Sequence, residues 1–348
     1  MIREKRMTPY FRRRLEPIEV KTPKKISELL LEMAKTGFQG RKLGEVVDVW
    51  EEMLKDDVVI FFGYAGSMST TGQWKIINWL IENRFIDVLV STGANISEDI
   101  LEAMGGTYWQ GHSLVDDEEL AEYRIDRFYD VFADELEYEQ MESLIADFML
   151  DLKSDYNYSS AEFLYLFGKH LSRINVKSIV ATAYENNVPV FCPAIVDSAY
   201  GVAYILNRRR SGGKFNVFID QMKDFDQIVE IKRRSKNTGV IYIGGGVPKD
   251  FIQLTAIASS ITEDGKYGKP SPHKYAIQIT TDAPHWGGLS GCTFEEAISW
   301  GKESKEGRNV QCYCDATIAL PIVVHALAER VDRRVNAPDL SWMFKDLA

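Results

Sequence analysis

Short apolar segments, each followed by a turn of small residues and then a helical pattern, constrain the fold of this 348-residue chain more than any other feature. Residues 57–62, Asp-Val-Val-Ile-Phe-Phe, form an almost continuous apolar run. Such a run is typical of a strand that is buried on both faces, as in a parallel sheet. A turn rich in small residues follows at 63–72, and Trp74, Ile77 and Ile81 then recur at the spacing of a helix.

The same order of strand, turn and helix repeats along the chain and predicts the fold class. Strands are predicted at residues 57–62, 86–90, 189–192, 214–219, 240–243, 275–279 and 310–314. Helices are predicted at 25–36, 43–55, 138–151, 159–171, 175–185, 225–235, 294–301 and 318–330, with three more starting near Trp74, Ser97 and Pro248. This alternation predicts an α/β fold: a Rossmann-like, doubly wound, mostly parallel sheet with helices on both faces.

We expect one domain preceded by a short arm. Residues 1–20 are rich in arginine and should form an extended basic arm, and residues 21–348 a single domain. Residues 105–137 are expected to be an irregular acidic insertion on its surface. In an open parallel sheet, ligands bind outside the carboxyl ends of the strands. Five predicted strand ends supply such loops, at 63–72, 91–98, 193–201, 244–250 and 280–291.

Charge and cysteine content argue against several classes of function. A net charge of −10 argues against nucleic-acid binding, which needs a basic surface, and is compatible with cationic ligands. No run of 18 apolar residues exists, so no membrane span is expected. The four cysteines lack the spacing of a disulfide framework, which favours a cytoplasmic location. Cys312 and Cys314 alternate on a predicted strand and face opposite sides, so no metal site is expected there.

Two glycine-rich turns favour a nucleotide site. Gly244, Gly245 and Gly246 lie between a predicted strand and a helix that starts near Pro248, where backbone N–H groups can approach a phosphate. The pattern is not the G-x-G-x-x-G fingerprint of dinucleotide-binding proteins, and a tight turn is the alternative interpretation. The second turn, at 63–72, strengthens the case for a dinucleotide.

Acidic residues gather near the same strand ends. Asp197 and Asp315 each follow a strand, where a carboxylate can hold ribose hydroxyls or cap the next helix. Further acids near these loops are Glu98, Asp250, Asp282 and Glu296. Each alone is expected to be a cap or a solvated charge, but together with Trp286 and Trp300 they could bind an alkyl polyamine. His285 is either catalytic or simply exposed on a loop, and we favour exposure.

Lys302 is the candidate nucleophile. It follows Trp300 and Gly301 at the end of a predicted helix. Desolvation beside an aromatic ring favours the neutral amine, which can attack a carbonyl or imine carbon. The alternative is a solvated lysine in the last turn of a helix, where its charge suits the helix dipole.

Four ordered segments resemble the deoxyhypusine synthase family. They are 192–197 (Cys-Pro-Ala-Ile-Val-Asp), 244–247 (Gly-Gly-Gly-Val), 296–302 (Glu-Ala-Ile-Ser-Trp-Gly-Lys) and 314–317 (Cys-Asp-Ala-Thr), within a resemblance that covers about residues 20–335. The resemblance implies NAD-dependent aminobutyl transfer on a Rossmann-like fold, in a homotetramer with sites at dimer interfaces. It also implies that the N-terminal arm can cover the entrance of a neighbour's site.

The resemblance assigns roles to individual residues. Lys302 matches the lysine that becomes a covalent imine, and Glu296 and Trp300 match residues that line the polyamine pocket. The positions that hold NAD in the family match Thr70, Thr92, Glu98, Asp197, Gly245, Gly246, Thr281 and Asp315. Asp250 stands where authentic deoxyhypusine synthases have a histidine, and Val202 where they have an aspartate; both family residues contact spermidine.

These departures point to a different acceptor. Residues 247–250 and 287–291 resemble the bacterial deoxyhypusine-synthase-like branch, whose members are similar to homospermidine synthases. A fixed carboxylate at Asp250 in place of an imidazole should change which amine is held there, so Asp250 is a predicted substrate residue. We therefore expect putrescine or spermidine as donor and a free polyamine as acceptor. The alternatives are a true deoxyhypusine synthase, acting on a lysine of a translation initiation factor, and a non-catalytic paralogue acting as a partner subunit.

Overall fold

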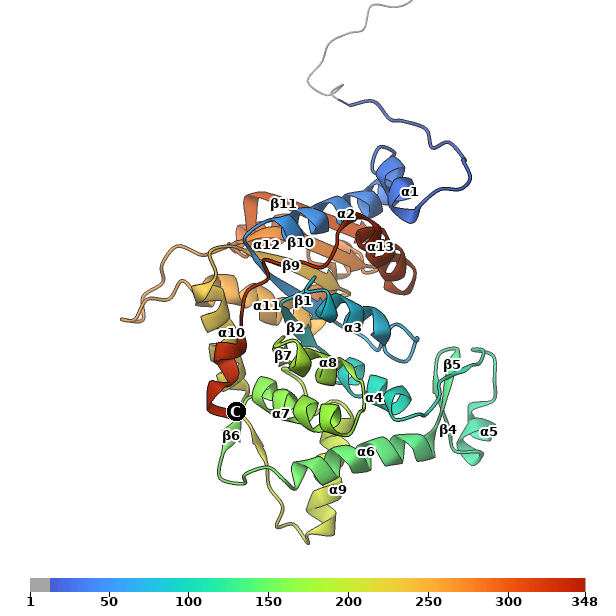
Figure 1. Cartoon of the computed structure of the whole chain (residues 1–348), viewed down its shortest axis with the longest axis vertical. Helices are drawn as coiled ribbons and strands as arrows, with labels where there is room; N and C mark the ends of the chain where they lie inside the picture. The colour runs from blue at the N-terminus through green and yellow to red at the C-terminus, as the bar shows by residue number, and fades with distance from the viewer. Residues whose placement is uncertain (1–12, 348) are drawn as a thin grey trace, which may run out of the picture.

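A six-stranded sheet forms the centre of the computed structural model, which describes residues 13–347 (Figure 1). Its strands are β1 (Val59–Tyr64), β2 (Val88–Ser91), β7 (Val190–Phe191), β9 (Thr238–Ile243), β10 (His273–Thr280) and β11 (Glu303–Tyr313). Every pairing is parallel, and the strand order is β11-β10-β9-β1-β2-β7. The predicted doubly wound, mostly parallel sheet is confirmed.

The strand order reverses between β1 and β9, in the middle of the sheet. The chain first adds β2 and β7 on one side of β1, and then adds β9, β10 and β11 on the other. This is the order of the doubly wound dinucleotide-binding fold, in which ligands bind where the order reverses. The carboxyl ends of β1 and β9 are therefore the expected position of a ligand.

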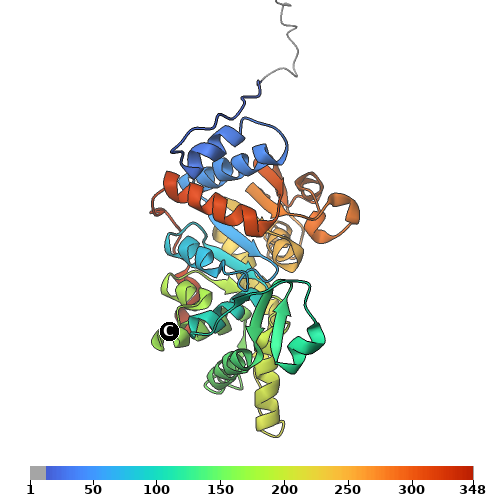
Figure 2. The same ribbon diagram turned by 90° about the vertical axis from the view of Figure 1, so that its right-hand side faces the viewer.

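Helices cover both faces of this sheet, as Figures 1 and 2 show from two directions. The first face packs against α2 (Phe38–Lys55), α3 (Trp74–Glu82) and α13 (Ala316–Arg330). The second packs against α10 (Gln221–Arg234), α11 (Gly246–Ala258) and α12 (Phe294–Ser299). Further α-helices are α1 (Ile26–Met33), α4 (Glu98–Ala103), α5 (Asp117–Glu122), α6 (Glu135–Met149), α7 (Ser160–Arg173), α8 (Ile179–Glu185) and α9 (Ala199–Arg210).

The two faces differ in chemistry. On the first face, β9, β10 and β11 contribute the apolar side chains Ile241, Ile243, Ile277, Ile279, Val310 and Cys312. On the second face, polar strand residues meet polar side chains of α10 and α11. We call this set the polar layer; its members are Lys232, Thr238, Tyr242, Lys249, Gln253, His273, Gln278, Glu303 and Gln311.

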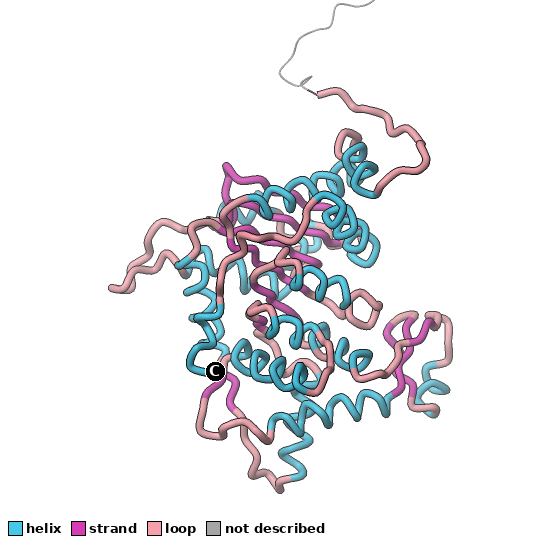
Figure 3. The backbone as a smooth tube through the Cα atoms, in the orientation of Figure 1, coloured by secondary structure: helices cyan, strands magenta, loops and turns pink. Residues whose placement is uncertain are grey.

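Two predicted segments differ from the structure, as the trace in Figure 3 shows. Residues 105–137 were expected to be irregular but contain an antiparallel sheet of β3 (Trp109–Gln110), β4 (Ile125–Phe128) and β5 (Val131–Asp134), together with α5. The predicted strand 214–219 is reduced to β8 (Phe218–Ile219), which pairs with β6 (Asn157–Tyr158) outside the main sheet. Its polar residues do not suit a sheet that is buried on both faces.

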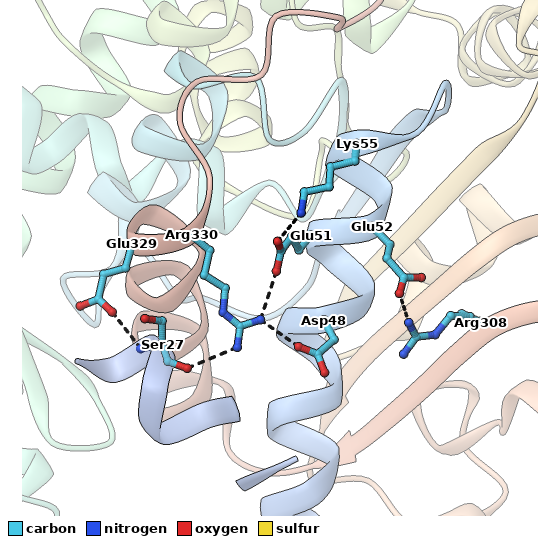
Figure 4. A network of polar contacts seen from close by, with 8 residues as sticks. All are labelled: Ser27, Asp48, Glu51, Glu52, Lys55, Arg308, Glu329 and Arg330. Carbon is cyan, nitrogen blue, oxygen red and sulfur yellow. Dashed lines mark hydrogen bonds and ion pairs between the residues drawn. The ribbon is translucent and has the colours of Figure 1, made fainter. Parts of the chain in front are cut away.

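Ion pairs hold the helices of the first face together (Figure 4). Arg330 of α13 donates to Asp48 at 2.8 Å and to Glu51 at 3.2 Å, both on α2. It also donates to the backbone carbonyl of Ser27 on α1, at 3.3 Å. Because the Arg330 side chain is largely buried, these contacts are screened less than exposed ion pairs. They fasten α1, α2 and α13 into one layer.

The end of the chain returns to the amino end of the central strands. Arg334 is buried; it donates to the carboxylate of Asp87 at 2.9 Å and to the backbone carbonyl of Val58 at 2.6 Å. Asp87 also accepts from the N–H of Ile60 at 2.8 Å. This buried ion pair therefore joins the C-terminal segment to β1 and to the turn before β2.

The expectations about domain division, membrane spans and metal sites can be compared with the structure only over residues 13–347. The division into an arm at 1–20 and one domain at 21–348 stays a prediction, and residues 1–12 lie outside the described residues. Within residues 13–347, no helix is long and apolar enough to cross a membrane. The same residues contain no group of three or more His, Cys, Asp or Glu side chains that could hold a metal ion.

Candidate functional site

A cavity of about 320 Å³ lies at the carboxyl edge of the sheet. Residues that end or follow β1, β9, β10 and β11 line it, so it lies where the strand order reverses. Three of the predicted cofactor residues are part of its lining, namely Gly245, Thr281 and Asp315, and Asp282 joins them. The position of this cavity matches the ligand site that the topology predicts.

The glycine turn after β9 needs its glycines for backbone geometry. Gly244 and Gly246 have φ values of +72° and +57°, in the left-handed region that glycine tolerates. A Cβ atom on Gly245 would lie 2.5 Å from the Cα of Ser290, so a side chain has no room there. The N–H of Gly246 donates to Ser290 Oγ at 3.0 Å. The turn therefore holds Ser290 against the start of α11 and the wall of the cavity.

Three predicted cofactor residues gather near the ends of β1 and β2. The carboxylate of Glu98 is nearly buried and accepts from Ser67 Oγ at 2.5 Å, and its burial raises its pKa. Thr70 Oγ1 donates to the carbonyl of Ser67 at 2.9 Å. Thr92 Oγ1 donates to the carbonyl of Gly66 at 2.7 Å. The structure thus brings Thr70, Thr92 and Glu98 together around one turn.

The two aspartates at strand ends lie far apart. Asp315 caps α13, since its Oδ1 accepts from the N–H of Thr317 at 2.7 Å, and it also lines the cavity. Asp197 follows β7, at the opposite edge of the sheet from β11, and its side chain is exposed. The helix after it is capped by Ser198 instead. Within one copy of the chain, Asp197 is therefore separate from Thr281 and Asp315.

Lys302 lies between α12 and β11 and is not a solvated lysine. Its Nζ donates to Oδ1 of Asp250, on α11, at 2.7 Å and lies 5.7 Å from the centre of the Trp300 ring. The Lys302 side chain is only 12% exposed, whereas that of Asp250 is 31% exposed. The amine is therefore mostly desolvated, and its carboxylate partner remains accessible from solvent.

Exposed aromatic and acidic side chains occur on α12, at its end and on the loop after β10. Trp300 is 64% exposed and Trp286 is 76% exposed. Glu296, in the first turn of α12, is exposed and lies beside the thiol of Cys292. His285 is also exposed, with its ring centre 4.5 Å from that of Trp286. Ring faces and a carboxylate are thus accessible to a cationic ligand.

Sequence reasoning missed a second buried lysine. Lys249 is fully buried and donates to Oε1 of Gln278 at 3.0 Å and to the carbonyls of Leu289 and Cys292 at 3.4 and 2.7 Å. Burial lowers its pKa. Two signals could have revealed it: its place directly before Asp250, and a lone glutamine in the otherwise apolar predicted strand 275–279.

Polar contacts join the cavity to the lysine. The amide nitrogen of Gln278 donates to the carbonyls of Gly244 and Ser290, both at 2.8 Å, and its oxygen accepts from Lys249. Gly244 and Ser290 line the cavity, and Lys249 directly precedes the carboxylate partner of Lys302. The cavity and the lysine are therefore linked through α11 and the segment after β10.

Together, fold and site define a doubly wound α/β protein with a cavity where the strand order reverses and a mostly buried lysine–carboxylate pair. The sequence model of the family described as deoxyhypusine synthase matches residues 28–327. The chain therefore belongs to the deoxyhypusine synthase family, and the resemblance found in its sequence is confirmed.

Curated relatives cover nearly the whole chain. It is 49% identical over 331 residues to "Probable deoxyhypusine synthase 2" of Methanosarcina mazei, which covers 94% of this chain and 93% of the relative. It is 37% identical over 306 residues to "Deoxyhypusine synthase-like protein" of Chlorobaculum tepidum, covering 87% and 86%. The relatives thus include proteins named as probable synthases and a protein named as synthase-like.

A solved structure shares the fold. The crystal structure described as a "putative deoxyhypusine synthase" from Entamoeba histolytica superposes with a TM-score of 0.65 and 17% sequence identity. The match covers 93% of this chain and 100% of that one. At this identity the likeness supports the architecture alone.

Proposed function

We propose that this protein is an NAD-dependent aminobutyltransferase. It moves the aminobutyl group of putrescine or spermidine, through an imine on Lys302, to a free polyamine. The observation that carries this proposal is the Lys302–Asp250 pair, with the lysine side chain 12% exposed beside Trp300. Membership in the deoxyhypusine synthase family supports the reaction class.

The residues at the carboxyl edge fit NAD. The cavity has Gly245 and Thr281 on its wall, and Asp315 supplies a carboxylate there that suits ribose hydroxyls. Glu98 supplies a second carboxylate on the neighbouring turn, with Thr70 and Thr92. NAD, when bound, would accept a hydride from the donor and later return it. Asp197 and Gly246 complete the set that we propose for this cofactor.

A second copy of the chain would complete the set. Asp197 lies at the edge of the sheet opposite the cavity wall formed by β11, yet the family resemblance assigns both regions to one cofactor. An arrangement in which Asp197 of one subunit approaches the cavity of another resolves this separation. We therefore include a homo-oligomer, a homotetramer by family resemblance, in the proposal.

Lys302 performs the covalent steps in this mechanism. Its neutral amine attacks the imine carbon of the oxidised donor, and the former donor nitrogen leaves as ammonia from putrescine or as diaminopropane from spermidine. The acceptor amine then attacks the same carbon and displaces Lys302. Asp250, 2.7 Å from Nζ, is placed to take the proton that Lys302 must lose before it attacks. Burial of the lysine limits the access of water to the imine.

The charges around Lys302 favour a small polycationic acceptor. Asp250 and Glu296 offer accessible carboxylates for ammonium groups, and Trp300 offers a ring face. Val202, on α9, is 49% exposed and carries no charge where authentic deoxyhypusine synthases have an aspartate. The altered charge pattern supports a free polyamine as acceptor.

Trapping the imine tests the proposal. The protein is incubated with NAD and labelled putrescine or spermidine and reduced with borohydride, and its peptides and small-molecule products are analysed by mass spectrometry. We expect the adduct on Lys302 and a labelled polyamine product. Lys305→Ala replaces an exposed lysine on β11, three residues after Lys302, and is the matched control that should behave like wild type. Absence of an adduct on Lys302, or full activity in Lys302→Ala, would refute the covalent step.

The names of the archaeal relatives favour one alternative acceptor. "Probable deoxyhypusine synthase 2" suggests a lysine of a translation initiation factor. Adding that factor to the same incubation decides between them, because label on the factor in place of a free polyamine would support a true deoxyhypusine synthase. A non-catalytic partner subunit is disfavoured by the presence of Lys302. Failure to bind NAD in a thermal-shift assay would favour it again.

A further inference from the structure

Glu303, the residue after Lys302, is a buried acid without an ion-pair partner. It is 2% exposed at the start of β11, in register with His273 of β10. Within residues 13–347, its carboxyl group takes part in no ion pair shorter than 4.0 Å. An ionised carboxylate in such a place is costly unless it is paired, so its hydrogen bonds decide its state.

The hydrogen bonds around Glu303 fit a neutral carboxylic acid. Its Oε1 accepts from the amide nitrogen of Gln253 at 3.0 Å and from the Tyr242 hydroxyl at 3.5 Å. Its Oε2 and the amide oxygen of Gln253 are buried and have no hydrogen-bond partner in the described chain. Both are acceptors, so a proton on Glu303 supplies the donor that the pair lacks. A carboxylate would leave Oε2 of Glu303 without a donor among the described residues.

The groups that face Glu303 are consistent with this state. Burial raises the pKa of Glu303 to about 8, against the opposing effects of Gln253, Lys232 and Lys249. Burial also lowers the pKa of His273 well below its ordinary value, so its imidazole is neutral. Lys232 donates to the Thr238 hydroxyl at 2.5 Å, which in turn contacts His273 Nδ1 at 2.8 Å.

Glu303 is linked to the reactive lysine through α11. Gln253 lies one turn after Lys249 and Asp250 on this helix, and Asp250 binds Lys302. Lys249 donates only to neutral acceptors, so its positive charge is not compensated by a carboxylate in direct contact. A neutral Glu303 leaves this charge in place on the helix whose next residue, Asp250, binds Lys302.

We propose that Glu303 is a positioning residue of the lysine site, which acts as a neutral buried acid that fixes Gln253 on α11 and leaves the charge of Lys249 uncompensated. Ionisation of Glu303 places a negative charge in the polar layer and favours the ammonium form of the nearby lysines. This inference rests on the proposed function of Lys302.

The test compares two substitutions. Glu303→Gln is permanently neutral and similar in shape to the acid. Glu306→Gln makes the same chemical change at an exposed site on the same strand. We measure kcat between about pH 6.5 and pH 9.5. Wild type and Glu306→Gln should lose roughly tenfold in rate by about pH 9, through one deprotonation. Glu303→Gln should stay within about threefold of wild type at pH 7 and lose the alkaline fall. The same midpoint in all three proteins, or an inactive but stably folded Glu303→Gln, would overturn the proposal.

Infrared difference spectroscopy gives a readout that does not depend on activity. Wild type minus Glu303→Gln should show the carbonyl stretch of a protonated carboxyl group at pH 7, and this band should vanish at about pH 9.5. Absence of the band at pH 7 would also overturn the proposal. If wild type forms no adduct with any polyamine, the proposed function has failed, and the infrared result still decides the state of Glu303.

Discussion

The two faces of the central sheet are built from the same strands but bury different kinds of side chain on β10. Ile277 and Gln278 are neighbours on β10, yet Ile277 packs into the apolar core of the first face, and Gln278 bonds to Lys249, Gly244 and Ser290 on the second. Both side chains are fully buried. The two residues are therefore equally buried, but Ile277 makes apolar contacts and Gln278 makes hydrogen bonds.

Burial of the apolar side chains on the first face stabilises the fold, and burial of the polar layer offsets part of that stabilisation. Burying apolar side chains stabilises by about 25 cal/mol per Å² of apolar surface. Burying ionisable groups such as Glu303, Lys249 and Lys232 is unfavourable, and hydrogen bonds offset only part of that cost. These buried ionisable side chains lie next to the lysine site. Their unfavourable burial is the reason to expect that they serve the site and not the stability of the fold. Four substitutions test the contrast.

The largest effect is expected at Lys302. Lys302→Ala should reduce aminobutyl transfer at least roughly a thousandfold, because it removes the amine that forms the imine in the proposed mechanism. The melting temperature should change little, since the replaced amine contacts one partly exposed carboxylate. Activity assays and thermal melts of this variant and Lys305→Ala check both statements. A large loss of stability in Lys302→Ala would mean that the lysine serves the fold.

Ile277→Ala tests the first face. It removes a fully buried side chain and should destabilise the protein by about 2–5 kcal/mol, as measured by urea unfolding. At a temperature where the variant remains folded, kcat should stay within about threefold of wild type. A kcat loss as large as that of a site residue would contradict the separation of the two faces.

Gln278→Leu tests the second face at the next residue. The change keeps the volume similar but removes an acceptor of Lys249 and the donor to Gly244 and Ser290. We expect a smaller stability loss than for Ile277→Ala, of about 1–3 kcal/mol, together with weaker NAD binding and slower adduct formation. Calorimetric titration with NAD measures the first effect and borohydride trapping the second. Unchanged binding and trapping would show that the polar layer is not coupled to the site.

The smallest effect is a pH-dependent stability difference at Glu303. Its pKa is raised by burial from 4.5 to about 8, so the folded state binds a proton that the unfolded state releases between these values. Stability due to Glu303 is therefore fully present below about pH 4.5 and is lost as the pH rises through about 8. Relative to Glu303→Gln, wild type should lose a few degrees of melting temperature across this window. A constant difference at all pH values would exclude the raised pKa.

The sequence predicts the apolar face better than the polar layer. Strands such as 57–62 are continuous apolar runs whose burial follows from composition alone, and the strand–helix order implies their parallel pairing. By contrast, Gln278, Lys249 and Glu303 come together only through tertiary packing. Each looks like an ordinary polar residue when read in isolation. The polar layer could not be assembled before the strand order was known.

For the candidate site, the sequence indicated the types of residue more reliably than their arrangement in space. Thr70, Thr92 and Glu98 do meet around one turn, and Asp250 does contact Lys302. The position of Asp197 at the far edge could not be foreseen, because spacing along a chain does not reveal which strands become neighbours. The cofactor and substrate roles of all these residues stay predictions.

The buried pair of Arg334 and Asp87 has a consequence for synthesis of the protein. Asp87 is made first, and its partner Arg334 follows 247 residues later. Until then, the carboxylate of Asp87 can pair with Arg84, 3.5 Å away, but it lacks the closer contact with Arg334 at 2.9 Å. Closure of this buried pair is thus tied to synthesis of residue 334. A product that stops short of Arg334 should remain loosely assembled and be removed by proteases before it can bind substrate.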